Sequence, residues 1–160
     1  MRHQHHSTRA RQVRRRGVTI VETAMIMPVF VLFLASLMEF GHFFLVRHMT
    51  NASARIAANY GCAEGVTNTQ VENKAKQIIG AAYNSNKATV IVRDAGVFDT
   101  ANVNPATLNY DSLPAITLSS AETSQFFLVQ VKVPYNDVAL LPPFWLKNVT
   151  VTGRSIMRHE

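Results

Sequence analysis

The stretch VTIVETAMIMPVFVLFLASLMEFGHFFLV, Val18–Val46, decides the architecture of this chain. Its only titratable residues are Glu22, Glu39 and His42. As an α-helix, the stretch would extend about 44 Å at roughly 1.5 Å per residue, and the hydrocarbon core of a bilayer is only ~30 Å thick. It therefore predicts a single membrane-spanning helix.

The positive charge of the chain is concentrated before this stretch. The formal net charge is +6, and no acidic residue stands among residues 1–17. The basic residues there are Arg2, Arg9, Arg11, Arg14, Arg15 and Arg16. From Gly17 onward, ten Lys and Arg residues (16 − 6) balance ten Asp and Glu residues. Because positive residues stay on the cytoplasmic side, we expect a cytoplasmic N-terminus and an external chain after about residue 47. The charge does not indicate nucleic-acid binding.

Three kinds of N-terminal segment are alternative interpretations of this pattern. A cleaved secretory signal needs small residues just after its apolar core, where this chain has Glu39 and Phe40. A twin-arginine signal is suggested by RRRGVTI, but it lacks the same cleavage site. An uncleaved signal anchor accounts for everything except Glu22, because a carboxylate near lipid is costly without a partner.

The run RRRGVTIVE, Arg14–Glu22, resembles the leader of the type IV pilin superfamily. The resemblance implies that a prepilin peptidase cuts between Gly17 and Val18 on the cytoplasmic face. Val18 would then carry a new α-amine one helical turn from Glu22, which also complements the helix dipole. In that superfamily the carboxylate pairs with the amine of a neighbouring subunit and sets the register of assembly. The alternative is a Glu22 that is merely exposed at the level of the lipid headgroups.

The longer stretch Gly17–Gly61 is similar to TadE-like proteins, the pseudopilins of Tad (tight adherence) pilus systems. The features that carry the similarity are Glu22, Pro28, Glu39, Phe40, Gly41 and the small-residue run TNASARIAANY at 50–60. Two positions depart from the usual pattern, because Thr23 replaces an aromatic residue and His42 a basic one. We expect these changes to affect processing and packing. Pro28 removes a backbone donor and predicts a kink in the helix.

Beyond the apolar stretch, helical periodicity continues to about Tyr60, and Gly61 is well placed to end the helix. The apolar positions that we expect to face a soluble domain are Leu45, Met49, Ala52, Ile56 and Tyr60. A second, amphipathic helix is predicted by a capping-box pattern at Thr69–Glu72 and by apolar residues on one face. Those residues are Val71, Ala75, Ile78, Ile79, Ala82 and Tyr83.

The rest of the chain has the pattern of strands. We expect strands in ATVIVRD (88–94), AITLSS (115–120), FFLVQVKVPY (126–135) and NVTVTGRSIM (148–157). The third alternates, with Phe127, Val129, Val131 and Val133 on one face. An antiparallel sheet covered on one side by helices follows, which makes the fold class α+β. We expect the aromatic residues of LPPFW, Leu141–Trp145, to cap the core.

No constellation of residues indicates catalysis or a cofactor. Cys62 is the only cysteine, so it can form a disulfide only with another chain. No Cys/His cluster has the spacing of a zinc site, and His42 and His48 are not on one helical face. The acidic loop Asp94–Asp111, which includes Asn102, lacks the regular spacing of a calcium loop, so we interpret its side chains as solvated turn residues.

Three segments follow: a basic leader at 1–17, a transmembrane and stem helix at 18–61, and an extracytoplasmic α+β domain at 62–160. The resemblance implies a non-enzymatic TadE-like minor pseudopilin of Tad-type pilus biogenesis, anchored by a single span in the inner membrane. Its implied partners are a prepilin peptidase, other pilin or pseudopilin subunits with the inner-membrane assembly platform, and membrane lipid. The alternative is a generic single-pass anchor carrying a binding module or an envelope enzyme.

Overall fold

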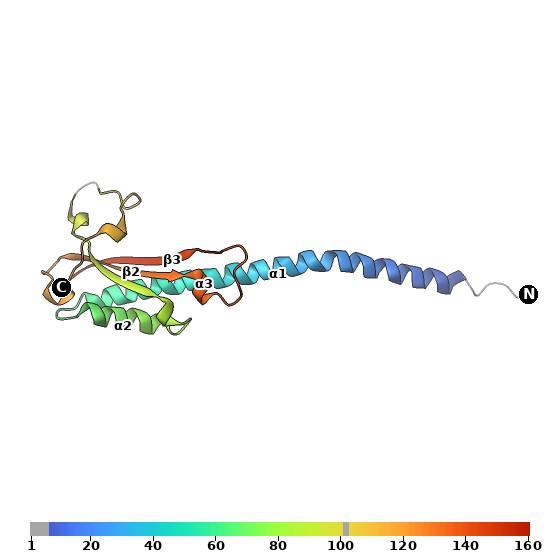
Figure 1. The fold of residues 1–160 in the computed structure, drawn as a ribbon, viewed down its shortest axis with the longest axis horizontal. Helices are drawn as coiled ribbons and strands as arrows, with labels where there is room; N and C mark the ends of the chain where they lie inside the picture. Colours follow the sequence, from blue (N-terminus) through green and yellow to red (C-terminus); the bar gives the residue numbers. More distant parts are fainter. Residues whose placement is uncertain (1–6, 101–102) are drawn as a thin grey trace, which may run out of the picture. The chain divides into compact units, whose positions relative to one another are not determined.

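The computed structural model describes residues 7–100 and 103–160, with side chains from residue 20 onward. The chain divides into two compact units, one up to Phe40 and the other Gly41–Glu160 (Figure 1). The helices are α1 (Ser7–Gly61), α2 (Asn68–Ile79) and α3 (Tyr135–Val138), and the strands are β1 (Thr89–Asp94), β2 (Phe126–Pro134) and β3 (Thr150–Arg158). Short 3₁₀ turns are η1 (Ser85–Lys87), η2 (Gly96–Asp99), η3 (Tyr110–Ser112) and η4 (Leu118–Ser120). The predicted α+β class is confirmed.

Helix α1 is longer than the sequence predicts. Its backbone is helical from Ser7, eleven positions before the expected start at Val18. It runs through Pro28 and ends at Gly61, where the stop was predicted. Gly61 also has a packing role, because a Cβ there would lie 3.0 Å from Cγ2 of Val71. Glycine at the end of α1 therefore permits a close contact with α2, and a larger residue would require the Val71 side chain to shift.

The three strands form one antiparallel sheet in the order β1-β2-β3. Central β2 pairs with both neighbours, so that Val131 lies opposite Val90 on β1 and Gly153 on β3. The predicted alternation is confirmed, because every second side chain of β2 enters one core with α1 and α2. The core includes Ala54, Ala57, Ala58, Val71, Ala75, Ile79, Phe127, Val129, Val131 and Val133.

The other face of the sheet is covered as well, which the sequence did not indicate. Leu128, on that face of β2, is fully buried with Ala95 and Leu113. Gln130, on the same face of β2 as Leu128, is also fully buried although its side chain is polar. The cover is the chain between β1 and β2, which bonds back to the sheet where the amide of Asp94 donates to the carbonyl of Pro114.

Residues 115–120 do not form the predicted strand. Ala115 makes one isolated bridge with Arg93, and Leu118–Ser120 is a 3₁₀ turn. The cause is Asn68, whose side chain donates to the carbonyl of Ile116 at 2.6 Å and accepts from the amide of Leu118 at 2.9 Å. A side-chain amide thus takes the backbone groups that a neighbouring strand would otherwise satisfy.

The predicted capping box is two residues too late. The N-cap of α2 is Thr67, whose hydroxyl accepts from the amide of Gln70 while the Gln70 side chain accepts from the amide of Thr67. Thr69, the predicted cap, lies inside the helix. The motif tolerates Gln as well as Glu at its fourth position, so two overlapping matches compete in this sequence. The earlier match leaves Asn68 in the first turn, where it reaches residues 116–118.

The buried face of α1 in the second unit is not the predicted one. Leu45, Ile56 and Tyr60 are 49%, 42% and 41% exposed. The fully buried residues are Val46, Thr50, Ser53, Ala54, Ala57 and Ala58. These are mostly small, and small side chains let the sheet approach the helix backbone closely. A stripe of larger apolar residues is left on the surface.

The aromatic residues of Leu141–Trp145 do not cap the core, contrary to the prediction. Phe144 is 68% exposed and Trp145 is 42% exposed. The residues of this connection that pack inward are Leu146 and Val149, which join Val46, Tyr135 and Val151 in a second cluster.

Candidate functional site

The apolar part of α1 presents its side chains outward. The segment Ile20–Gly61 is long and apolar enough to cross a bilayer, and the window that meets this test has no buried residue. Ile20, Met25 and Val29, for example, are 69%, 75% and 67% exposed. A core helix of a soluble protein would be covered, so exposure of so much apolar surface favours a lipid-facing segment.

The predicted processing residues lie in the first unit. Gly17 and Val18 fall in the helical backbone of α1, and their side chains lie outside the described ones. Glu22 is exposed and stands among exposed apolar residues, including Ile20, Val21 and Ile26. The backbone spacing agrees with one helical turn between Val18 and Glu22. Cleavage itself stays a prediction.

Three other motif residues surround the junction of the two units. Glu39 is partly buried, Phe40 is 41% exposed, and Gly41 is exposed. A Cβ built on Gly41 would meet no atom within 4 Å, so packing does not require glycine there. Helix α1 continues through Pro28 without a break, and the predicted kink stays a prediction.

Two tyrosines join α1 to the domain, through contacts that no local pattern of residues predicts. His42 Nδ1 lies 3.3 Å from the hydroxyl of Tyr135, whose side chain is buried. The hydroxyl of Tyr83 lies 2.8 Å from Oγ1 of Thr50. Burial raises the pKa of Tyr83, and the hydrogen bond with Thr50 opposes part of that rise. The ring of His42 thus contacts the ring of Tyr135, with 5.9 Å between their centroids.

Cys62 follows the end of α1. It is partly buried, and its thiol donates to the carbonyl of Ala58 at 3.4 Å. Burial, with a smaller contribution from the charge of Glu160, raises the pKa of the thiol. A disulfide with another chain stays a prediction, because it requires the thiol to be accessible to a cysteine of that chain.

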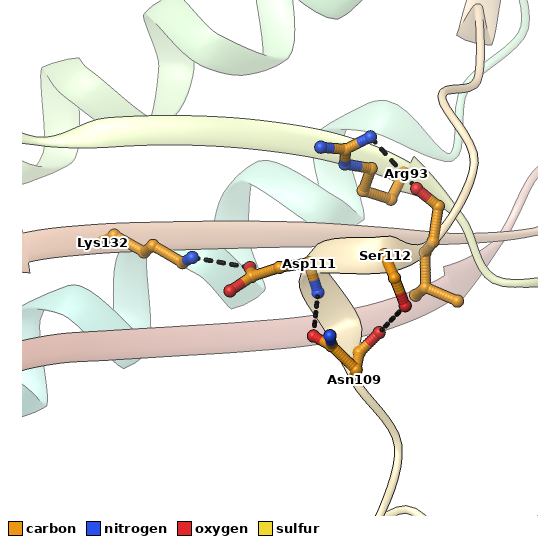
Figure 2. A network of polar contacts seen from close by, with 6 residues as sticks. Arg93, Asn109, Asp111, Ser112 and Lys132 are labelled. Atoms are coloured by element: carbon orange, nitrogen blue, oxygen red, sulfur yellow. Dashed lines mark hydrogen bonds and ion pairs between the residues drawn. The ribbon is translucent and has the colours of Figure 1, made fainter.

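Asp111 attaches the connection between β1 and β2, which covers the outer face of the sheet, to Lys132 of β2 (Figure 2). Asp111 accepts from Nζ of Lys132 at 2.6 Å, and its amide donates to Oδ1 of Asn109 at 3.1 Å. The hydroxyl of Ser112 donates to the carbonyl of Asn109 at 2.8 Å. Arg93 donates to the carbonyl of Leu113 at 3.0 Å (Figure 2). The lysine lowers the pKa of Asp111 by its hydrogen bond first and by its charge second.

The other acids of this region also have structural partners. Asp94 accepts from the amide of Gly96 at 2.8 Å, and Asp99 lies 3.6 Å from Arg158. Asn102 lies outside the described residues. Within the described part of the chain, no group of three or more His, Cys, Asp or Glu side chains is arranged to hold a metal ion. The interpretation as turn and surface residues agrees with these contacts.

Among the described residues, one exposed apolar helix is long enough to cross a bilayer, and it leads into an α+β domain, which suggests a single-pass membrane anchor. Residues 17–59 match the family model of TadE-like proteins, which confirms the resemblance predicted from the sequence. No curated protein and no solved structure matches the chain. The match and the exposed helix together support a Tad-associated, membrane-anchored protein.

Proposed function

We propose that this chain is a minor pseudopilin of a Tad-type pilus system, a non-enzymatic subunit that enters or primes the assembly. The observation that carries the proposal is the family match over residues 17–59, which begins at the glycine before the expected cleavage point and spans the apolar helix. The basic residues before Gly17 support an inner-membrane topology with a cytoplasmic N-terminus.

A prepilin peptidase would cut between Gly17 and Val18. In the uncut chain this peptide bond lies within helical backbone, so the cut needs local unwinding. Glycine makes unwinding easier, because it lowers helix stability by about 1 kcal/mol relative to alanine. The cut removes the basic leader and creates an ammonium group at Val18.

Glu22 would pair with such an ammonium group on a neighbouring subunit. A carboxylate at membrane depth costs about 2.5–3.5 kcal/mol or more, and a partner of opposite charge recovers part of that cost. The exposed stripe of Leu45, Ile56 and Tyr60 supports lateral packing by the same helix beyond the apolar segment. Pairing would set the axial register, and the stripe would add contact area.

The deciding experiment is the intact mass and N-terminal sequence of the protein extracted from its native membrane. A chain that begins at Val18 supports processing, and Gly17→Leu should keep the leader attached. Gly41→Leu is the matched control, because it replaces a glycine of the same helix that has open space around it. If the chain still begins at Met1 in cells with active peptidase, the chain is a plain membrane anchor instead.

A further inference from the structure

One connection in the domain exposes large apolar side chains in a group. Leu140, Leu141, Phe144 and Trp145 are 71%, 51%, 68% and 42% exposed. Among the described residues beyond α1, these four are all of the large hydrophobic residues that are exposed. We name them the apolar tip. A group of this kind on an otherwise polar surface marks a place where something covers it.

Packing and hydrogen bonds fix both ends of the connection that carries the apolar tip. Leu146 and Val149 pack into the domain beside Tyr135, and Asn136 and Asn148 join the two ends of the connection. The side chain of Asn136 donates to that of Asn148 at 2.9 Å and accepts from its backbone amide at 3.0 Å. Pro142 and Pro143, at the centre of the tip, have no backbone N–H to pair with a strand.

The tip lies at the end of the domain where the chain enters from the apolar segment. Its base shares a cluster with Phe43 and Val46 of α1, and Phe43 is the third residue of the unit that begins at Gly41. The opposite end of β2 is Phe126, which lies in a separate cluster with Phe98. The nine residues of β2 separate the two ends by roughly 27 Å, at about 3.4 Å per residue.

We propose that the apolar tip inserts into the phospholipid surface on the side of the membrane that carries the domain. The proposal rests on the membrane anchoring in the proposed function, since the span would place Gly41 next to that surface. Tryptophan and phenylalanine suit the boundary between headgroups and acyl chains. Lys147 lies 5.9 Å from the ring centroid of Phe144, where its ammonium group can reach lipid phosphates.

An open hollow next to the tip suits the same role. It measures about 530 Å³ and is lined by Asn136, Ala139, Leu140, Leu141, Pro142, Pro143, Lys147 and Asn148. Its lining combines apolar residues with the amide groups of Asn136 and Asn148 and the ammonium group of Lys147, a mixture that suits the boundary between acyl chain and headgroup. With the tip inserted, the domain would have a second attachment to the membrane besides α1.

Trp145 is the only tryptophan of the chain, so its fluorescence reports on the tip directly. The full chain would be reconstituted in vesicles of mixed zwitterionic and anionic phospholipid, with acrylamide on both sides of the bilayer in one series and lipid brominated near the headgroup in another. We expect brominated lipid to remove most of the emission and acrylamide to remove little. Quenching by acrylamide alone would overturn the proposal, and protection from both quenchers would assign the tip to a second copy of the chain.

Two variants make the result specific. Trp145→Phe combined with Phe98→Trp moves the reporter to the opposite end of β2, where brominated lipid should no longer quench it. Leu140→Ser, Leu141→Ser and Phe144→Ser together keep Trp145 but should make it accessible to acrylamide; unchanged quenching in this triple variant contradicts insertion. Flotation of the vesicles is checked first, because a chain that does not float with them contradicts membrane anchoring itself.

Discussion

At the scale of single residues, Gly153 is the point where β3 meets the backbone of α1. A Cβ at this position would lie 2.5 Å from the carbonyl oxygen of Thr50 and 3.0 Å from Cα of Asn51. Both atoms belong to helix backbone, so neither can move aside as the end of a long side chain can. The small residues of α1 and this glycine therefore form one close contact.

Gly153→Ala should destabilise the domain by about 1–3 kcal/mol, the usual cost of forcing an extra carbon into a packed interior. The melting temperature of the full chain in detergent, followed by circular dichroism, measures the loss. Gly41→Ala is the control, since open space surrounds that glycine and alanine favours helix. Equal melting temperatures for the two variants would mean that β3 does not approach α1 this closely.

Cys62 should react slowly with alkylating reagents. Burial raises its pKa, so at pH 8 a smaller fraction is thiolate than in an unburied cysteine, and only the thiolate is the nucleophile. The rate of iodoacetamide labelling, relative to free cysteine at the same pH, checks this. The rate should recover in urea. Equal rates in the folded and unfolded chain would show a thiol that is open to a disulfide partner.

At the scale of elements, one side chain of α2 holds the segment that follows β1. Asn68 both donates to Ile116 and accepts from Leu118, so Asn68→Ala removes two hydrogen bonds from partly buried backbone groups. We expect a loss of about 1–3 kcal/mol. Hydrogen exchange should show faster exchange at the Leu118 amide. Asn73→Ala, on the exposed face of the same helix, should leave that amide unchanged.

The stability contributed by the β1–β2 connection over the outer face of the sheet should depend on pH. Lys132 lowers the pKa of Asp111, so this carboxylate stabilises the fold above its ordinary pKa, and the contribution disappears as the pH falls through the lowered value. The melting temperature of the wild type should thus exceed that of Asp111→Asn at pH 7 and approach it as the pH falls below the ordinary pKa of an aspartate. Asp137→Asn, at an exposed position of α3, is the control. A difference that persists unchanged at low pH would contradict the pairing.

At the scale of the whole molecule, α1 serves two environments with one continuous helix. Its first part presents apolar side chains outward, and its last part contributes small residues to the domain core. Past Gly41, Leu45, Ile56 and Tyr60 are exposed as well. Under the proposed function, the first part of the helix would lie in the bilayer and these three residues would contact a neighbouring subunit.

Glu22→Gln should separate processing from assembly. The variant should still lose its leader, because Gly17 and the basic residues are unchanged, but it should no longer copurify with other pilin subunits after mild cross-linking. An amide cannot form the ion pair with the Val18 ammonium. Glu64→Gln, at an exposed position of the domain, should behave as the wild type. If the Glu22→Gln variant copurifies with other pilin subunits as well as the wild type does, the carboxylate does not set the axial register of assembly.

Periodicity and composition were sufficient to predict several elements of the fold. The apolar run from Val18, the alternation of β2 from Phe127 to Val133, and the end of α1 at Gly61 were all predictable, because each depends on residues close together in the sequence. The motif at Gly17–Gly41 was also visible as a local pattern. The candidate site residues could be named for the same reason, although their roles depend on other chains.

Which of several suitable surfaces is buried depends on contacts between segments that are far apart in the sequence. Two neighbouring faces of α1 carry apolar residues, and the face with Ala54 and Ala57 packs inward because β3 supplies Gly153 about a hundred residues later. Asn68 bonds the backbone of Ile116 and Leu118, which lie 48 and 50 residues later, in a segment where a strand was predicted. Local sequence determines how apolar residues are spaced within an element. Close packing between distant segments determines which apolar residues are buried. The residues of the apolar tip are not buried by this packing and remain exposed.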